Sequence, residues 1–132
     1  MRIDILTLFP ETVGDVLSDS ILGRAQERGF IRIETHQIRE YTTNKQCQVD
    51  DYPYGGGRGA VMMADPLYRC WDYVCQQAEG KVHTIYMSPC GKTFTQADAI
   101  RLSKMENLVL VCGHYEGVDQ RFIDECVDEE IS

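Results

Sequence analysis

The sequence predicts an α/β domain in which a parallel sheet is covered by helices on both faces. Short apolar runs alternate with amphipathic stretches along the chain, which is typical of strand–helix–strand units. Residues 108–113 (LVLVCG) form a fully apolar run of the kind found in strands buried on both faces. The length of 132 residues suits one domain. No internal repeat interrupts this pattern.

The N-terminal part predicts a strand, one or two helices and a second strand. Residues 3–9 (IDILTLF) are an apolar strand-like run, and Pro10 favours the start of a helix after it. Residues 11–28 carry apolar side chains at helical spacing. Within them Ser20 is expected to cap a second short helix, which Gly29 would end. Residues 31–38 (IRIETHQI) alternate as in a strand.

A long loop and a clear helix are expected next. Residues 39–63 show no period, and a loop of that length in a compact domain tends to be functional. Asp65 is expected as N-cap and Pro66 as the first helical residue of a helix that ends at Gly80.

The C-terminal part repeats the alternation. Residues 82–87 (VHTIYM) predict a strand, and Thr95 is expected to cap the helix that follows. After the strand at residues 108–113, Asp119 should open a last helix with Phe122, Ile123 and Cys126 facing inward.

Composition excludes several classes of protein but names no partner. The net charge is −8, and residues 116–132 alone carry −6 of it (seven acids, one Arg), so the first 115 residues are close to neutral. No basic patch is visible that would indicate nucleic-acid binding. No apolar run is long enough to cross a membrane, and Asp4 inside the first apolar run argues against a signal peptide. A cytoplasmic protein is therefore expected.

The six cysteines are expected to be small core residues. A cytosolic chain argues against disulfides, no CxxC pair occurs, and the three histidines are scattered, so no metal site is predicted.

Two loops follow predicted strands at the sheet edge where ligands of open α/β sheets bind. These are residues 88–92 (SPCGK) and residues 113–119 (GHYEGVD). The glycines of GHYEG are four residues apart, which does not match a phosphate- or dinucleotide-binding pattern. From its position alone, Glu116 is either a solvated turn carboxylate or a group that holds a ligand's ammonium or hydroxyl. His114 and Tyr115 either stack on a ring or pack.

Residues 52–63 (YPYGGGRGAVMM) concentrate four glycines in five positions. Glycine clusters destabilise a fold unless the backbone needs positive φ angles or close approach to a ligand. A flexible exposed loop is the alternative. Pro53 before the cluster and the apolar residues after it favour a loop that is anchored at both ends.

Three segments together resemble bacterial tRNA (guanine-N1)-methyltransferases of the SPOUT superfamily. They are residues 52–63, 85–96 (IYMSPCGKTFTQ) and 108–124 (LVLVCGHYEGVDQRFID), followed by residues 128–132 (DEEIS), and the resemblance begins at residue 1. It implies a SPOUT-type α/β fold with a C-terminal trefoil knot, an exception to the rule against knots. It also implies S-adenosyl-L-methionine as cofactor, methyl transfer to N1 of the guanine 3′ of the anticodon, tRNA as partner and a homodimer. The sequence leaves a Mg²⁺ requirement open.

The resemblance also assigns site residues. Met87 and Pro89 would hold the adenine side of the cofactor. Its ribose and methionine parts would be lined by Gly113, Tyr115, Glu116 and Gly117, and a side chain at Gly113 is expected to fill the ligand's space. The methyl group and the target base would lie beside Tyr54, Gly55, Gly56 and Gly59.

Two positions depart from the family. Arg58 stands where the family usually has a small residue or Pro, and Ala60 stands where it has Met. Arg58 either pairs with a tRNA phosphate, stacks on the base or is simply solvated.

By resemblance, residues 1–132 are an N-terminal SPOUT methyltransferase domain in which the knot is incomplete and the tRNA-binding domain absent. The family's catalytic aspartate would lie beyond Ser132, so no catalytic residue is expected within this chain. The strand at residues 108–113 would then lack a neighbour, and residues 126–132 (CVDEEIS) would hang free. Residues 1–132 alone are expected to transfer no methyl group. The alternative is a flavodoxin-like nucleotide-binding or signalling module, which does not explain the glycine-rich loop.

Overall fold

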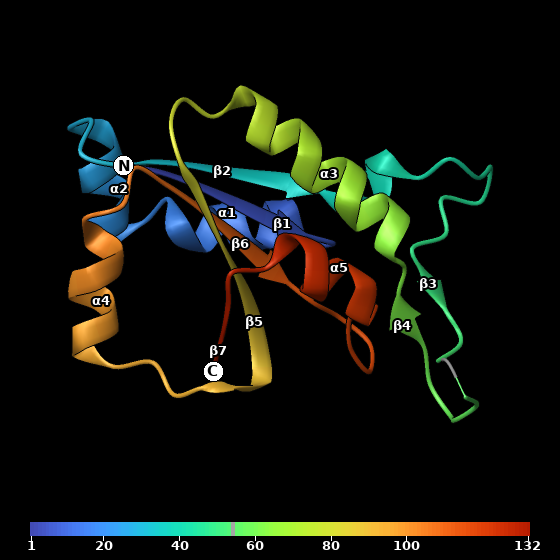
Figure 1. Ribbon diagram of the computed structural model, residues 1–132. Helices are drawn as coiled ribbons and strands as arrows, with labels where there is room; N and C mark the ends of the chain where they lie inside the picture. The colour runs from blue at the N-terminus through green and yellow to red at the C-terminus, as the bar shows by residue number, and fades with distance from the viewer. Residues whose placement is uncertain (54) are drawn as a thin grey trace.

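The computed structural model describes residues 1–53 and 55–132, and it contains the predicted α/β fold. A five-stranded sheet has the order β2-β1-β6-β5-β7, and all of its strand pairs are parallel (Figure 1). Its strands are β1 (Arg2–Thr7), β2 (Arg32–Gln37), β5 (Val82–Lys92), β6 (Asn107–Cys112) and β7 (Glu129–Ile131).

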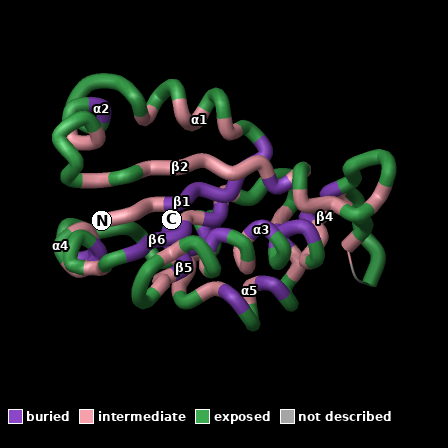
Figure 2. The backbone as a smooth tube through the Cα atoms, turned by 90° about the horizontal axis from the view of Figure 1, so that it is seen from above, coloured by how far each residue is buried: buried purple, intermediate pink, exposed green. Residues whose placement is uncertain are grey.

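Helices cover both faces of this sheet, as the sequence predicted. They are α1 (Pro10–Leu17), α2 (Ser20–Glu27), α3 (Ala64–Gln77), α4 (Gln96–Ser103) and α5 (Gln120–Cys126). Seen from above, α1 and α2 lie on one side of the strands, while α3 and α5 lie on the other (Figure 2).

Alternate residues of β1, β5 and β6 pack into two separate cores, because successive side chains of a strand point to opposite faces. Leu6, Val109 and Val111 belong to the larger core, together with residues of α3 and α5. The smaller core on the other face joins Ile85, Leu108 and Ile131 to Leu102 of α4.

The starts of two helices differ from the sequence prediction. Ser20 is the first residue of α2 and not its cap, because Asp19 takes the N-cap position in extended conformation. Helix α3 begins at Ala64, so Asp65 and Pro66 lie within its first turn. Proline is tolerated there because the first N–H groups of a helix have no intrahelical partner. The Asp65 carboxylate instead accepts a hydrogen bond from Arg69 Nε at 3.0 Å.

The other helix boundaries are as predicted, except for the end of α3. The two-helix reading of residues 11–28 is confirmed, and Gly29 follows α2 with φ of +74°. Thr95 and Asp98 form a reciprocal capping box at α4. Asp119 caps α5 by accepting a hydrogen bond from the Arg121 N–H at 2.9 Å. Helix α3, however, ends at Gln77, before Gly80.

Residues 39–63 contain more structure than the long loop that the sequence predicted. A 3₁₀ helix, η1 (Ile38–Tyr41), is followed by the antiparallel pair β3 (Asp50–Asp51) and β4 (Val61–Met62). This small hairpin projects beyond the sheet, next to the start of α3 (Figure 1). Two-residue strands leave no alternation that a sequence pattern could reveal.

The end of the chain contradicts the expectation that it hangs free. Strand β6 has a neighbour on each side, β1 and β5, and residues 129–131 form strand β7 beside β5. Ile131 is 2% exposed and belongs to the smaller core. The acidic side chain of Glu129, two residues before Ile131, is tolerated because it is paired with Arg101, Lys92 and His83.

The cysteines divide by burial. Cys70 and Cys126 are buried and Cys75 and Cys112 are half-buried, which agrees with a packing role, whereas the prediction is wrong for Cys47 and Cys90, which are exposed. Burial raises the pKa of the Cys70 thiol to about 12, so it stays neutral.

Among the residues that the structure describes, no helix has the length and apolar character needed to cross a membrane.

Candidate functional site

The carboxyl ends of β5 and β6 bring the two predicted ligand loops together. Met87 pairs with Cys112, the last residue of β6, so residues 88–92 of β5 and the residues that follow β6 begin side by side. Met87, Pro89, Gly113, Tyr115 and Glu116 are exposed there, and Gly117 is half-buried. This edge is accessible to a ligand.

Residues 88–92 belong to β5 and are not a separate loop, contrary to the sequence prediction. Met87 and Lys92 both pair with Ile131 of β7, so residues 88–91 bulge out between two ladder positions. Ser88 is buried, and its Oγ accepts a hydrogen bond from the Cys90 N–H at 3.2 Å. A β-bulge of this kind places main-chain groups outside the ladder.

The glycine-rich segment and the GHYEG segment, far apart in sequence, are joined by main-chain hydrogen bonds. The Glu116 N–H donates to the Ala60 carbonyl at 3.0 Å, and the Met62 N–H donates to the Gly117 carbonyl at 2.9 Å. The Asp119 N–H donates to the Met62 carbonyl at 3.0 Å. These bonds anchor the segment at its C-terminal end, and the pairing of Asp50 and Asp51 with β4 ties the residues just before it, in line with the predicted anchoring at both ends.

Positive φ angles explain much of the glycine cluster. The φ angles are +84° at Gly55, +80° at Gly56 and +104° at Gly59, a region that other residues rarely adopt. At Gly59 a side chain would also overlap Cγ of Glu116. Arg58 is exposed between these glycines. The predicted base contact at Tyr54 lies outside the described residues.

Three rings form a row at the same edge. The centroids of His114 and Tyr115 are 4.7 Å apart, and those of Phe9 and His114 are 5.3 Å apart, both edge-to-face. Phe9 was not predicted, although it follows β1, whose carboxyl end adjoins that of β6. Tyr115 has φ of +61°, an uncommon conformation for a residue other than glycine.

At Gly113, protein atoms as well as a predicted ligand would limit a larger residue. A Cβ atom there would lie 3.0 Å from Cε2 of Tyr86 and 3.2 Å from Cγ2 of Val118. A larger residue would therefore press on the Tyr86 ring.

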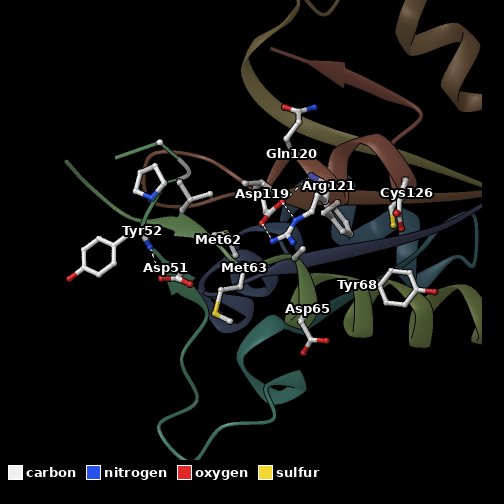
Figure 3. A pocket seen from close by; sticks show the side chains of 17 residues that line it. Asp51, Tyr52, Met62, Met63, Asp65, Tyr68, Asp119, Gln120, Arg121 and Cys126 are labelled. Carbon is white, nitrogen blue, oxygen red and sulfur yellow. Dashed lines mark hydrogen bonds and ion pairs between the residues drawn. The ribbon is translucent and has the colours of Figure 1, made fainter. Parts of the chain in front are cut away.

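A cavity of about 1090 Å³ opens beside the hairpin, between the starts of α3 and α5 (Figure 3). Its rim carries Asp51, Asp65 and Asp119, and Arg121 Nη2 donates to Asp119 Oδ2 at 2.7 Å. Hydrogen bonding from Arg121 lowers the pKa of Asp119. Of the site residues predicted from sequence, the described part of the chain contributes only Gly55 to this lining. The cavity therefore adjoins the segment that the sequence predicts to bind the substrate, and none of the predicted cofactor residues is part of its lining.

One acidic cluster has the geometry of a metal site but is already paired. Ligand atoms of Asp4, Glu34 and His36 lie within 4.8 Å of one another. Arg2 Nε donates to Asp4 Oδ2 at 2.8 Å, and His36 Nε2 lies 2.7 Å from Asp4 Oδ1. The Arg2 guanidinium already pairs with the Asp4 carboxylate, so these residues form a partly buried ion-pair cluster.

The residues at the ends of β5 and β6 fit S-adenosyl-L-methionine in chemical type. The exposed Met87 and Pro89 offer an apolar surface to a flat ring, and Gly113 and Gly117 offer main chain without side-chain obstruction. The exposed carboxylate of Glu116 suits a cationic ligand.

Comparison with known proteins assigns the chain to one family. The family model described as "tRNA (Guanine-1)-methyltransferase TrmD" matches residues 1–132. Proteins named tRNA (guanine-N(1)-)-methyltransferase from Ruminiclostridium cellulolyticum and Clostridium perfringens are 49% and 54% identical over 132 residues. Both alignments cover 100% of this chain, and 57% and 54% of the relatives, so the chain spans about half of their length.

A solved structure agrees with the fold. The crystal structure of tRNA (m1G37) methyltransferase from Aquifex aeolicus superposes with a TM-score of 0.91 at 36% identity, covering 100% of this chain and 59% of that one. These matches do not favour a flavodoxin-like module. Since the family model matches the chain from its first residue to its last, the chain belongs to the tRNA (Guanine-1)-methyltransferase family.

Proposed function

We propose that the protein containing this chain transfers a methyl group from S-adenosyl-L-methionine to N1 of the guanine 3′ of the anticodon in tRNA. Family membership and the printed name of the Aquifex aeolicus protein support this reaction. The observation that carries it is the joining of two segments: Glu116 N–H to the Ala60 carbonyl at 3.0 Å and Met62 N–H to the Gly117 carbonyl at 2.9 Å. A donor site and an acceptor site must adjoin for direct transfer, and these bonds hold the two candidate sites together.

The cofactor half of the site would be formed by β5 and β6. S-adenosyl-L-methionine, when bound, supplies an electrophilic methyl group on a sulfonium. Met87 and Pro89 would contact the adenine, while Gly113, Tyr115, Glu116 and Gly117 would line the ribose and methionine. The negative charge of Glu116 would favour a cationic ligand at this edge.

The substrate half would be the glycine-rich segment. Gly55, Gly56 and Gly59 let the main chain turn sharply, and Arg58 on the same turn is exposed for contact with tRNA. The exposed ring of Phe9 supports a role in stacking, because unstacked bases of RNA bind to aromatic side chains. We assign no residue of this chain as the general base that removes the N1 proton. A homodimer, a trefoil knot and a cytoplasmic location are parts of the same proposal.

Calorimetry separates this function from the flavodoxin-like alternative. The protein is titrated with S-adenosylhomocysteine and, separately, with flavin mononucleotide. Saturable binding of S-adenosylhomocysteine without flavin binding is expected. Binding of flavin alone would overturn the proposal.

A further inference from the structure

We propose that Glu129 of β7 is a positioning residue for the cofactor segment, residues 87–92, and that it acts through strand β7. Its link to S-adenosyl-L-methionine rests on the function proposed above. The geometric part stands on contacts within the chain itself.

Strand β7 is the element against which the cofactor segment pairs and packs. Met87 and Lys92, at the two ends of the bulge, both pair with Ile131. The Ser132 N–H donates to the Lys92 carbonyl at 2.8 Å, and the Phe94 N–H donates to the Ser132 carbonyl at 3.0 Å. Both ends of the bulge and the residues after it are therefore tied to the last residues of the chain.

Gly91 shows how closely the bulge packs on β7. A Cβ at Gly91 would lie 2.6 Å from the Ile131 nitrogen and 2.7 Å from the carbonyl carbon of Glu130. Backbone atoms cannot move aside as a flexible side chain can. Any shift of β7 is thus transmitted directly to residues 88–91.

Strand β7 has three residues, so its own ladder is short, and Glu129 supplies the additional attachment. Arg101 Nη1 and Nη2 donate to the two carboxylate oxygens of Glu129 at 2.9 and 3.0 Å. His83 Nε2 lies 2.7 Å from Glu129 Oε1, and Lys92 Nζ lies 3.3 Å from Oε2. The carboxylate thus joins β7 to β5 and α4.

Lys92 connects this cluster to the cofactor segment itself. Lys92 Nζ also donates to Asp98 Oδ1 at 2.7 Å, and Arg101 Nη2 donates to the same oxygen at 2.9 Å. Two carboxylates therefore balance two permanent cations. Removing the charge of Glu129 leaves both cations facing Asp98 alone, which loosens β7 and the end of the bulge together.

The test uses Glu129→Gln and the milder Arg101→Lys, which keeps the charge but loses the two-pronged geometry. Asp4→Asn is the matched control, because Asp4 is also a paired carboxylate, 1% exposed, but lies on the opposite face of the sheet. All variants are made in the full-length protein and measured at a temperature where each is folded. Amide hydrogen exchange of residues 88–92 is recorded without ligand, and S-adenosylhomocysteine affinity is measured by titration.

Glu129→Gln is expected to speed exchange in residues 88–92 and to weaken S-adenosylhomocysteine binding roughly 2- to 30-fold, the range typical of residues that act on a site without touching the ligand. Arg101→Lys should show the same effects more weakly, and Asp4→Asn should show neither. Equal exchange and equal affinity in Glu129→Gln and wild type would overturn the inference, as would equal losses in Asp4→Asn. If wild type binds no S-adenosylhomocysteine, the proposed function fails, and exchange alone then decides whether Glu129 positions the segment.

Discussion

Gly59 shows how one residue links the two halves of the candidate site. Its φ of +104° and the overlap that an added Cβ would make with Cγ of Glu116 both favour the absence of a side chain. The sequence indicates that glycines are needed in this segment, but it cannot show that Glu116, far along the chain, is the neighbour. Such a constraint depends on the fold that brings the two segments together.

Gly59→Ala is expected to cost about 1–2 kcal/mol of stability through its positive φ, and to weaken S-adenosylhomocysteine binding by displacing Glu116. Gly29→Ala is the control, since Gly29 also has a positive φ, +74°, but no atom within 4 Å of an added Cβ. Denaturant unfolding and ligand titration are compared for both variants. Equal affinity in the two variants would show that the Gly59–Glu116 contact has no part in binding.

Arg58 is expected to contact a tRNA phosphate. Arg58→Ala should weaken tRNA binding and reduce the slope of log affinity against log salt by roughly 0.9, the value for one phosphate of a duplex. Lys81→Ala is the control, because Lys81 precedes β5 at the opposite edge of the sheet. A slope that is identical in wild type and Arg58→Ala would indicate a solvated side chain.

Among the elements, those with a local signal were predictable and those that depend on distant partners were not. The apolar strand β6 and the helix cap at Thr95 depend on residues that are close together in the sequence. Strand β7 has no local signal, because two of its three residues are acidic and the partners of Glu129, Arg101 and Lys92, are distant in the sequence. The hairpin β3–β4 has no detectable pattern because its strands are too short to show alternation, and Pro89 and Gly91, which are usual in turns, favour a loop at residues 88–92.

The candidate site was predictable to the same extent. The edge formed by β5 and β6 follows from the order of the elements, and it holds all of the predicted cofactor residues. Phe9 and the cavity near Asp119 depend on packing between elements, which the sequence does not display.

The contribution of the α4 capping box to the free energy of unfolding should be measurable. Thr95→Ala removes the hydroxyl that accepts the Asp98 N–H and is expected to cost about 1 kcal/mol of stability in urea unfolding. Asp19→Ala provides the comparison, because Asp19 is the N-cap of α2 but its side chain makes no capping hydrogen bond. A cost at Asp19 as large as that at Thr95 would contradict the capping account.

For the whole molecule, carboxylates paired with cations make stability depend on pH. Burial alone would raise the pKa of Glu129, but hydrogen bonds from Arg101, His83 and Lys92 lower it to about 2, from an ordinary value of 4.5. Hydrogen bonds from Lys92, Arg101 and Thr95 lower the pKa of Asp98 as well. Carboxylates with depressed pKa values stabilise the folded state above their unfolded pKa, and this stabilisation is lost as the pH falls.

Thermal unfolding should therefore show constant stability near neutral pH and a decline as the pH falls from about 5 towards 2, with a loss of more than about 5 °C by pH 3. Glu129→Gln should flatten this decline, because one of the shifted groups is gone. A pH profile of the variant parallel to that of wild type would show that Glu129 is not among the groups responsible.

Methyl transfer tests the central claim most directly. The full-length protein is incubated with S-adenosyl-L-methionine carrying a labelled methyl group and with tRNA that has guanine 3′ of the anticodon, or with the same tRNA carrying adenine there. Label should enter the guanine-containing tRNA, with 1-methylguanine as the modified nucleoside, and the adenine-containing tRNA should remain unlabelled. Equal labelling of both tRNAs, or no labelling of either by protein that binds S-adenosylhomocysteine, would contradict the proposed function.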